Sequence, residues 1–171
     1  INKPIKSYFR HPAGKYYLND KIFNMLFPLL NNQKYLNKVE KFDNQKIDIN
    51  FDLLRDLPIN LLFDNATYAN VITGVKANLF EPFLEADDHR EIKNKIIIQR
   101  SYRYRNDLIN YKFLNQYNDI FFVGTVEEFE DLKKEVKNLN FYDCKDFLDM
   151  ASVVKSSRFV VANSSITFPI A

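Results

Sequence analysis

The sequence predicts an α/β fold with a Rossmann-like parallel sheet in its C-terminal half. Two observations support this prediction: short, continuously apolar runs recur from residue 95 onward, and stretches with helical spacing separate them. Continuous apolar runs are typical of strands buried on both faces. Strands that alternate with helices are joined by crossovers, which make the strands parallel and place helices on both faces of the sheet.

The C-terminal half contains four strand candidates, over residues 95–99, 119–124, 141–142 and 159–161. We expect helices over residues 107–117, 125–139 and 146–157, and the first turns of another over residues 166–171. The second of these helices has the clearest start, because Thr125 is followed by two early carboxylates.

The first half is less regular. It offers a short strand at 7–10, an apolar helix at 22–30, an alternating strand at 47–52 and a helix at 68–75. An acidic stretch containing Pro82 then separates the halves. We therefore expect part of a first α/β domain over residues 1–80, an acidic linker over 81–94, and a truncated Rossmann-like domain over 95–171.

Composition narrows the function classes. Hydrophobic residues make up 46% of the 171 residues and aromatics 15%, which indicates a globular protein. The net charge of +2, without a basic stripe, argues against a nucleic-acid partner. No apolar run reaches the roughly 18 residues expected of a transmembrane segment.

Cysteine and histidine are scarce. Cys144 is the single cysteine and there are two histidines, so neither an internal disulfide nor a Cys/His zinc site of the usual spacing is expected. A reducing compartment fits this usage best, and we expect a cytoplasmic protein with no metal site and no cofactor.

Ligands of open parallel sheets bind beyond the carboxyl ends of the strands. That rule selects three loops: Gln99–Asn106, Gly124–Glu127 and Ala162–Ser165. Each of them carries polar side chains or a glycine directly after an apolar run. These three loops are therefore the candidate ligand-binding segments.

The first loop carries three arginines, and Arg100, Ser101 and Arg103 are its candidate phosphate ligands. The planar guanidinium suits phosphate because it donates two charge-assisted hydrogen bonds at once. The alternative is that these arginines cover an exposed edge and pair with Asp107 or Glu127.

In the second loop, Gly124 would allow close approach of the backbone to a ligand, next to Thr125 and Glu127. The alternative there is a tight turn with a threonine cap.

Hydroxyl and amide groups at a helix start form the third candidate, made of Asn163, Ser164 and Ser165. Ordinary capping of the helix is the alternative. His11 is a candidate general base, because it stands in a loop of the first half, although a plain surface histidine explains it as well.

These motifs resemble the nucleotide-sugar half of GT-B glycosyltransferases, and in particular the heptosyltransferase branch, glycosyltransferase family nine. The resemblance rests on the segments 99–104, 122–128, 146–154 and 159–165. It implies transfer of a sugar from a nucleotide-sugar donor to an unidentified acceptor, such as a glycan or glycolipid, without a metal. It also implies that the domain over residues 1–80 is the acceptor side and that the domain over residues 95–171 binds the donor. It also implies that Arg100, Ser101, Arg103, Asn163, Ser164 and Ser165 bind the diphosphate, and that Gly124, Thr125 and Glu127 bind the nucleotide.

Two departures from that family keep other functions open. The Thr-Gly-x-x-His motif is missing after the last strand, and Ala162 stands where relatives carry glycine. A non-catalytic module that binds a nucleotide or phosphosugar is therefore one alternative. An interaction protein that uses the fold as a scaffold is another, since fold does not fix function.

Overall fold

The computed structural model describes residues 19–51, 65–76, 78 and 81–171. The strand expected at residues 7–10 and the candidate base His11 lie outside these residues. The chain divides into two compact units: residues 1–20 with 40–83, and residues 21–39 with 84–171. The second unit contains the sheet.

A four-stranded parallel sheet forms the centre of this second unit. Its strands are β1 (Ile96–Gln99), β2 (Ile120–Val123), β3 (Leu139–Tyr142) and β4 (Phe159–Ala162), in the spatial order β3-β2-β1-β4. Ile96 pairs with Ile120 on one side and with Phe159 on the other. The α/β class and the parallel sheet expected from the sequence are thus confirmed.

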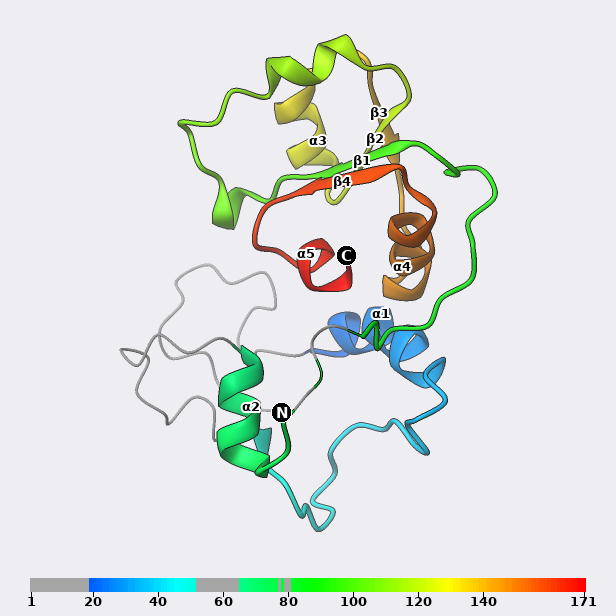
Figure 1. Ribbon diagram of the computed structural model, residues 1–171, viewed down its shortest axis with the longest axis vertical. Coiled ribbons are helices and arrows are strands. Elements are labelled where there is room, and N and C mark those ends of the chain that lie inside the picture. The colour runs from blue at the N-terminus through cyan, green and yellow to red at the C-terminus, as the bar shows by residue number, and fades with distance from the viewer. Residues whose placement is uncertain (1–18, 52–64, 77, 79–80) are drawn as a thin grey trace. The chain divides into compact units, whose positions relative to one another are not determined.

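Helices cover both faces of this sheet. They are η4 (Tyr111–Gln116), α3 (Val126–Lys133), α4 (Phe147–Ser156) and α5 (Thr167–Ile170). Figure 1 shows α3 on one side of the strands, with α4 and α5 on the other.

Alternation along β1 supplies both faces with apolar side chains. Ile96 and Ile98 pack with Phe129 and Leu132 of α3, whereas Ile97 packs with Val153 and other residues of α4. Because both faces of β1 and most of β2 are buried, these two strands are nearly continuous apolar runs in the sequence.

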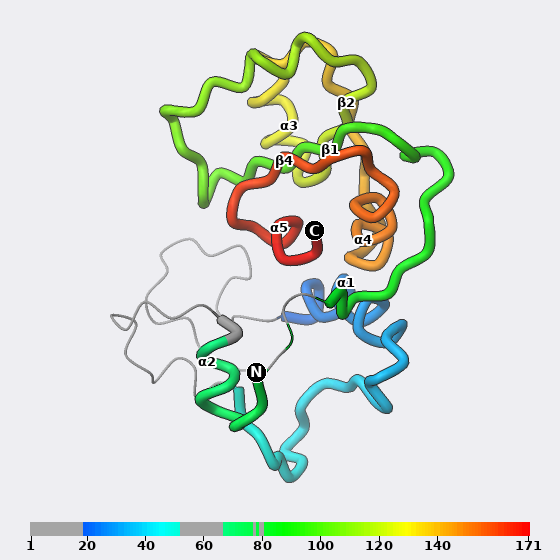
Figure 2. The backbone as a smooth tube through the Cα atoms, viewed as in Figure 1, coloured from blue at the N-terminus to red at the C-terminus, as the bar shows by residue number. Residues whose placement is uncertain are grey.

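The helix α1 (Asp20–Asn31) belongs to the sheet unit from Lys21 onward, although it is far from the strands in the sequence. Leu29 joins the apolar cluster of α4, and the tube in Figure 2 shows α1 beside α4. The sequence predicts this helix as part of the domain over residues 1–80, whereas it packs with the sheet.

The acidic stretch before the sheet is also packed. Ile92 is 1% exposed, and the backbone N–H of His89 donates to the hydroxyl of Ser156 at 2.6 Å. Residues 84–94 therefore run along α4, and the change of unit comes at Phe83. The stretch expected as a linker supplies part of the core.

Within the first unit, the described residues contain the helix α2 (Asn65–Thr73). Gly74 ends it with a φ of +71°, and its N–H donates to Asn70 O at 2.7 Å. The strand expected at 47–52 is not formed over residues 47–51, where Ile47 and Ile49 are about half exposed. An alternating pattern becomes a strand only when a neighbour pairs with its backbone.

Two expected helices are shorter than their apolar spacing suggested. The stretch 107–117 forms η4 only from Tyr111, because the Asn106 side chain accepts from Leu108 N and turns the chain first. The helix from Thr125 ends at Lys133 rather than Leu139. Asn115 binds the backbone of Glu135 and of Lys137 there, and directs the chain into β3.

Candidate functional site

The order of the strands creates one topological switch point, between β1 and β4. From β1 the chain proceeds to β2 and then β3 on one side, and it returns to place β4 on the opposite side of β1. The loops that leave β1 and β4 therefore depart in different directions. In open parallel sheets this is where a crevice for a ligand forms.

Asn163 joins the two loops at this point. Its Oδ1 accepts from the backbone N–H of Ser101 at 3.2 Å and from the Ser101 hydroxyl at 3.3 Å, while its Nδ2 donates to Ser101 O at 2.8 Å. The Asn163 N–H in turn donates to Gln99 O, which extends the β1–β4 pairing by one residue. We call this arrangement the Ser101–Asn163 clamp.

The serines after the clamp differ in exposure. Ser165 donates a hydrogen bond to the buried side chain of Gln99, whereas Ser164 is exposed. The helix α5 that follows has only four residues and no side-chain cap, so its dipole is small. An anion at this position would depend on side-chain and loop groups rather than on the helix.

At the end of β2, Gly124 has a φ of +148°, which L-residues rarely adopt. A Cβ on Gly124 would lie 2.8 Å from Phe122 Cε1, so the turn requires glycine for a structural reason. Thr125 and Glu128 then form a capping box at the start of α3. The tight turn with a threonine cap, the alternative from the sequence, is therefore observed here. Binding of a nucleotide by Gly124, Thr125 and Glu127 stays a prediction.

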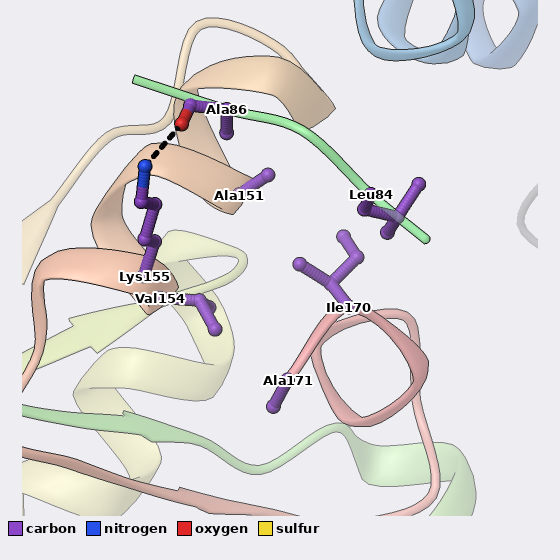
Figure 3. A pocket seen from close by; sticks show the side chains of 7 residues that line it. All are labelled: Leu84, Ala86, Ala151, Val154, Lys155, Ile170 and Ala171. Carbon is purple, nitrogen blue, oxygen red and sulfur yellow. Dashed lines mark hydrogen bonds between the residues drawn. The ribbon is translucent and has the colours of Figure 1, made fainter. Parts of the chain in front are cut away.

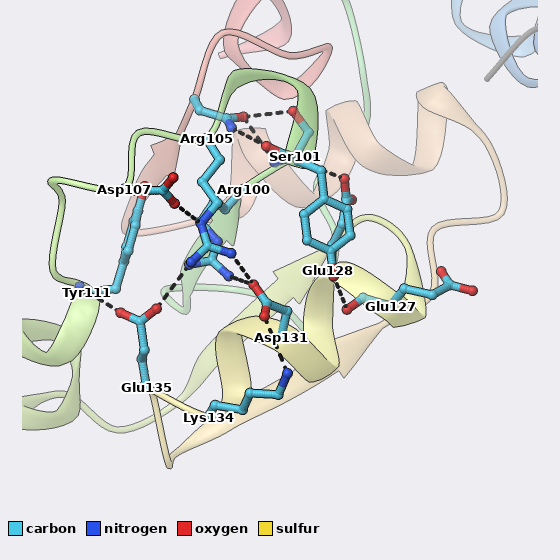
Figure 4. Close-up of polar contacts among 12 residues, drawn as sticks. Arg100, Ser101, Arg105, Asp107, Tyr111, Glu127, Glu128, Asp131, Lys134 and Glu135 are labelled. Carbon is cyan, nitrogen blue, oxygen red and sulfur yellow. Dashed lines mark hydrogen bonds and ion pairs between the residues drawn. The ribbon is translucent and has the colours of Figure 1, made fainter. Parts of the chain in front are cut away.

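Arg100 lies beside the clamp but is enclosed. It is 3% exposed, its Nη1 donates to Glu135 at 3.2 Å, and its Nη2 donates to Asp131 at 2.5 Å (Figure 4). The guanidinium also lies 5.3 Å above the ring of Tyr111. Arg100 thus fastens the loop after β1 to α3, which gives it a structural role.

The other two arginines of this loop lie further out. Arg105 contacts Asp107 at 2.6 Å and Asp131 at 2.7 Å, so pairing with Asp107, one alternative from the sequence, is observed for Arg105. Arg103 is exposed, and its guanidinium carbon lies 4.9 Å from the centre of the Tyr104 ring. Of the two arginines predicted to bind diphosphate, Arg103 is the one open to solvent.

A second polar cluster lies at the end of β3, and sequence reasoning did not find it. The Nδ1 of His89 accepts from Ile92 N, which assigns the imidazole proton to Nε2, 2.7 Å from the Tyr142 hydroxyl. The hydroxyl donates to Asp149 at 3.3 Å. His89 stands 53 residues before Tyr142 in the sequence, and no spacing rule connects it with Tyr142 or Asp149.

Two pKa values are raised at this second cluster, that of Tyr142 and that of the nearby Cys144. Burial raises the pKa of Tyr142 to about 12, with a further contribution from the Asp149 carboxylate. Burial also raises the pKa of the Cys144 thiol to about 12, helped by Asp149, Asp143 and Asp146. Both groups are protonated at neutral pH, so Cys144 is a poor nucleophile.

A cavity of about 290 Å³ lies among α4, α5 and the segment 84–86 (Figure 3). Apolar side chains of Leu84, Val154 and Ile170 line it, and Lys155 at its edge donates to Ala86 O at 2.7 Å. None of the predicted site residues is part of its lining. The cavity and the switch point are therefore separate features of the sheet unit.

Metal ligands do not gather in the described residues: no three His, Cys, Asp or Glu side chains are arranged to hold an ion there. Nor does that part of the chain contain a helix long and apolar enough to cross a membrane. Comparison with known proteins found no match to a family model, a curated protein or a solved structure.

Proposed function

We propose that the sheet unit binds a nucleoside diphosphate at the β1/β4 switch point, as the donor-binding half of a glycosyltransferase. The observation that carries this proposal is the Ser101–Asn163 clamp, which brings the loops of β1 and β4 together at the position where open parallel sheets bind ligands. The reaction would transfer a sugar from its nucleotide carrier to an unidentified acceptor.

Charge determines which side chains would act in this reaction. Cleavage of the bond between sugar and diphosphate leaves negative charge on the diphosphate, and positioned donors or cations stabilise that charge. Arg103 and the hydroxyl of Ser164 are exposed and can meet such a ligand. Arg100 is already bound to two carboxylates, so we assign it the support of the loop instead.

Calorimetric titration with ADP, UDP and GDP tests the proposal. We expect Arg103→Ala and Ser164→Ala to weaken the preferred nucleotide, the arginine change by about tenfold because it removes a charge-assisted contact. Arg158→Ala is the matched control, since this exposed arginine directly precedes β4 and lies at the amino end of that strand, away from the loop that follows it. No binding, or equal weakening by the control, would contradict the proposal.

A non-catalytic nucleotide-binding module is the second candidate, and the neutralisation of Arg100 favours it. Because Arg100 is paired with Asp131 and Glu135, fewer positive side chains remain to stabilise a leaving diphosphate than the sequence suggested. Release of free nucleoside diphosphate from nucleotide sugars separates the two functions. An enzyme releases it in proportion to time, whereas a binding module binds the nucleotide sugar and leaves it intact.

A further inference from the structure

Tyr102, between Ser101 and Arg103, is fixed at both ends and yet exposed. Its backbone N–H donates to Glu128 Oε1 at 2.9 Å, and its hydroxyl donates to the backbone oxygen of Glu127 at 3.1 Å. Both acceptors belong to the first turn of α3. Nevertheless 52% of Tyr102 remains accessible to solvent.

The neighbouring tyrosine is used differently. Tyr104 carries the guanidinium of Arg103 near its ring, with 4.9 Å between guanidinium carbon and ring centre. Tyr102 instead donates both of its polar hydrogens to α3. These two bonds hold its ring in one orientation between the loop after β1 and the start of α3. An aromatic ring held this way loses little conformational freedom when a ligand stacks on it.

The position of Tyr102 relates it to both candidate loops. Its predecessor, Ser101, is in the clamp with Asn163. Its acceptor Glu128 also accepts from Thr125 N, which follows Gly124 at the end of β2. If the diphosphate of a ligand lies at the clamp, its phosphate contacts include Ser101, and Tyr102 is the next residue in the chain.

We propose that Tyr102 is a stacking platform for the nucleobase of the nucleotide bound at the switch point. This inference rests on the proposed function and specifies how the base is held. Every base has a π-face, so stacking on tyrosine accepts purines and pyrimidines alike. The ligand class is thus a nucleoside diphosphate, recognised through its base as well as its phosphates.

The test is calorimetric titration of the full chain with ADP, UDP and inorganic pyrophosphate. We expect Tyr102→Leu to weaken ADP by about tenfold, because it removes the stacking surface, while the affinity for pyrophosphate stays unchanged. Tyr102→Phe keeps the ring and should stay within about threefold of wild type. Tyr35→Leu is the control, since Tyr35 is a 57% exposed tyrosine elsewhere in the same unit.

The outcomes separate the two proposals. If wild type binds ADP and Tyr102→Leu leaves that affinity unchanged, or weakens pyrophosphate equally, the platform is wrong and the nucleotide site stands. A Tyr102→Phe variant as weak as Tyr102→Leu would likewise overturn stacking. If wild type binds none of the three ligands, the proposed function fails, and the platform with it.

Discussion

Polar side chains gather beyond the edge strand β3 and beyond the neighbouring strands β1 and β4, but the two groups are packed differently. At β3, the His89 and Asp149 side chains are 16% and 15% exposed and are connected through the Tyr142 hydroxyl. At β1 and β4, the clamp borders Ser164 and Arg103, both exposed. We infer that the first cluster stabilises the fold and that the second is available to a ligand.

The largest expected effect is that of Arg100. This residue precedes the clamp residue Ser101 in the sequence, but it is buried like the side chains at β3. We expect Arg100→Met to lower the free energy of unfolding by about 3 kcal/mol, since Glu135 would lose its cation and Asp131 would keep only its more exposed partners, Arg105 and Lys134. Urea denaturation followed by circular dichroism measures this. A loss below about 1 kcal/mol would show that Arg100 is not a structural support.

Tyr142→Phe examines the enclosed cluster itself. Removal of the hydroxyl leaves His89 and Asp149 without their shared partner, and we expect a loss of about 2 kcal/mol in the free energy of unfolding. Nucleotide affinity should not change. If affinity falls while stability is kept, the roles assigned to the two clusters must be exchanged.

Asn163→Ala examines the open cluster. It removes three hydrogen bonds to Ser101, two of them accepted by the same oxygen. Because this region is partly solvated, we expect only about 1 kcal/mol of lost stability, together with about tenfold weaker binding of the nucleotide. Thermal melts and calorimetry on the same sample give both values. A stability loss as large as that of Arg100→Met, with binding intact, would make the clamp purely structural.

The smallest expected effect near neutral pH is that of the Cys144 thiol, which appears only at alkaline pH. The Cys144 thiol keeps its proton in the folded protein up to a pKa of about 12, against an ordinary 9.0. The unfolded chain therefore binds fewer protons between these values, and stability falls as the pH rises from about 9 towards 12. Cys144→Ala should remove this part of the loss, which is close to zero at pH 8 and about 1 kcal/mol at pH 10. Urea denaturation of both proteins at pH 8 and pH 10 measures it, and parallel losses would show that the thiol is not shielded.

The sheet was predictable because its signals are local. The strands after residue 95 are apolar runs with turns between them, and Thr125 with Glu128 marks a helix start within four residues. Contacts between distant segments were not predictable. Nothing in the spacing of Arg100 and Glu135 shows that they pair, and His89 meets Tyr142 only after residues 84–94 pack along α4. The switch point depends on the spatial order of the strands, and that order cannot be read from the positions of the strands in the sequence.

The most direct test of the account is to map where a nucleotide binds. Nitrogen-15 NMR spectra of the labelled protein, titrated with ADP, report each backbone amide separately. We expect the largest shifts at Ser101, Gly124 and Asn163, with Tyr142 and Asp149 unmoved. Shifts centred on Tyr142 and Asp149, or no shifts at any amide, would contradict a ligand site at the junction of β1 and β4.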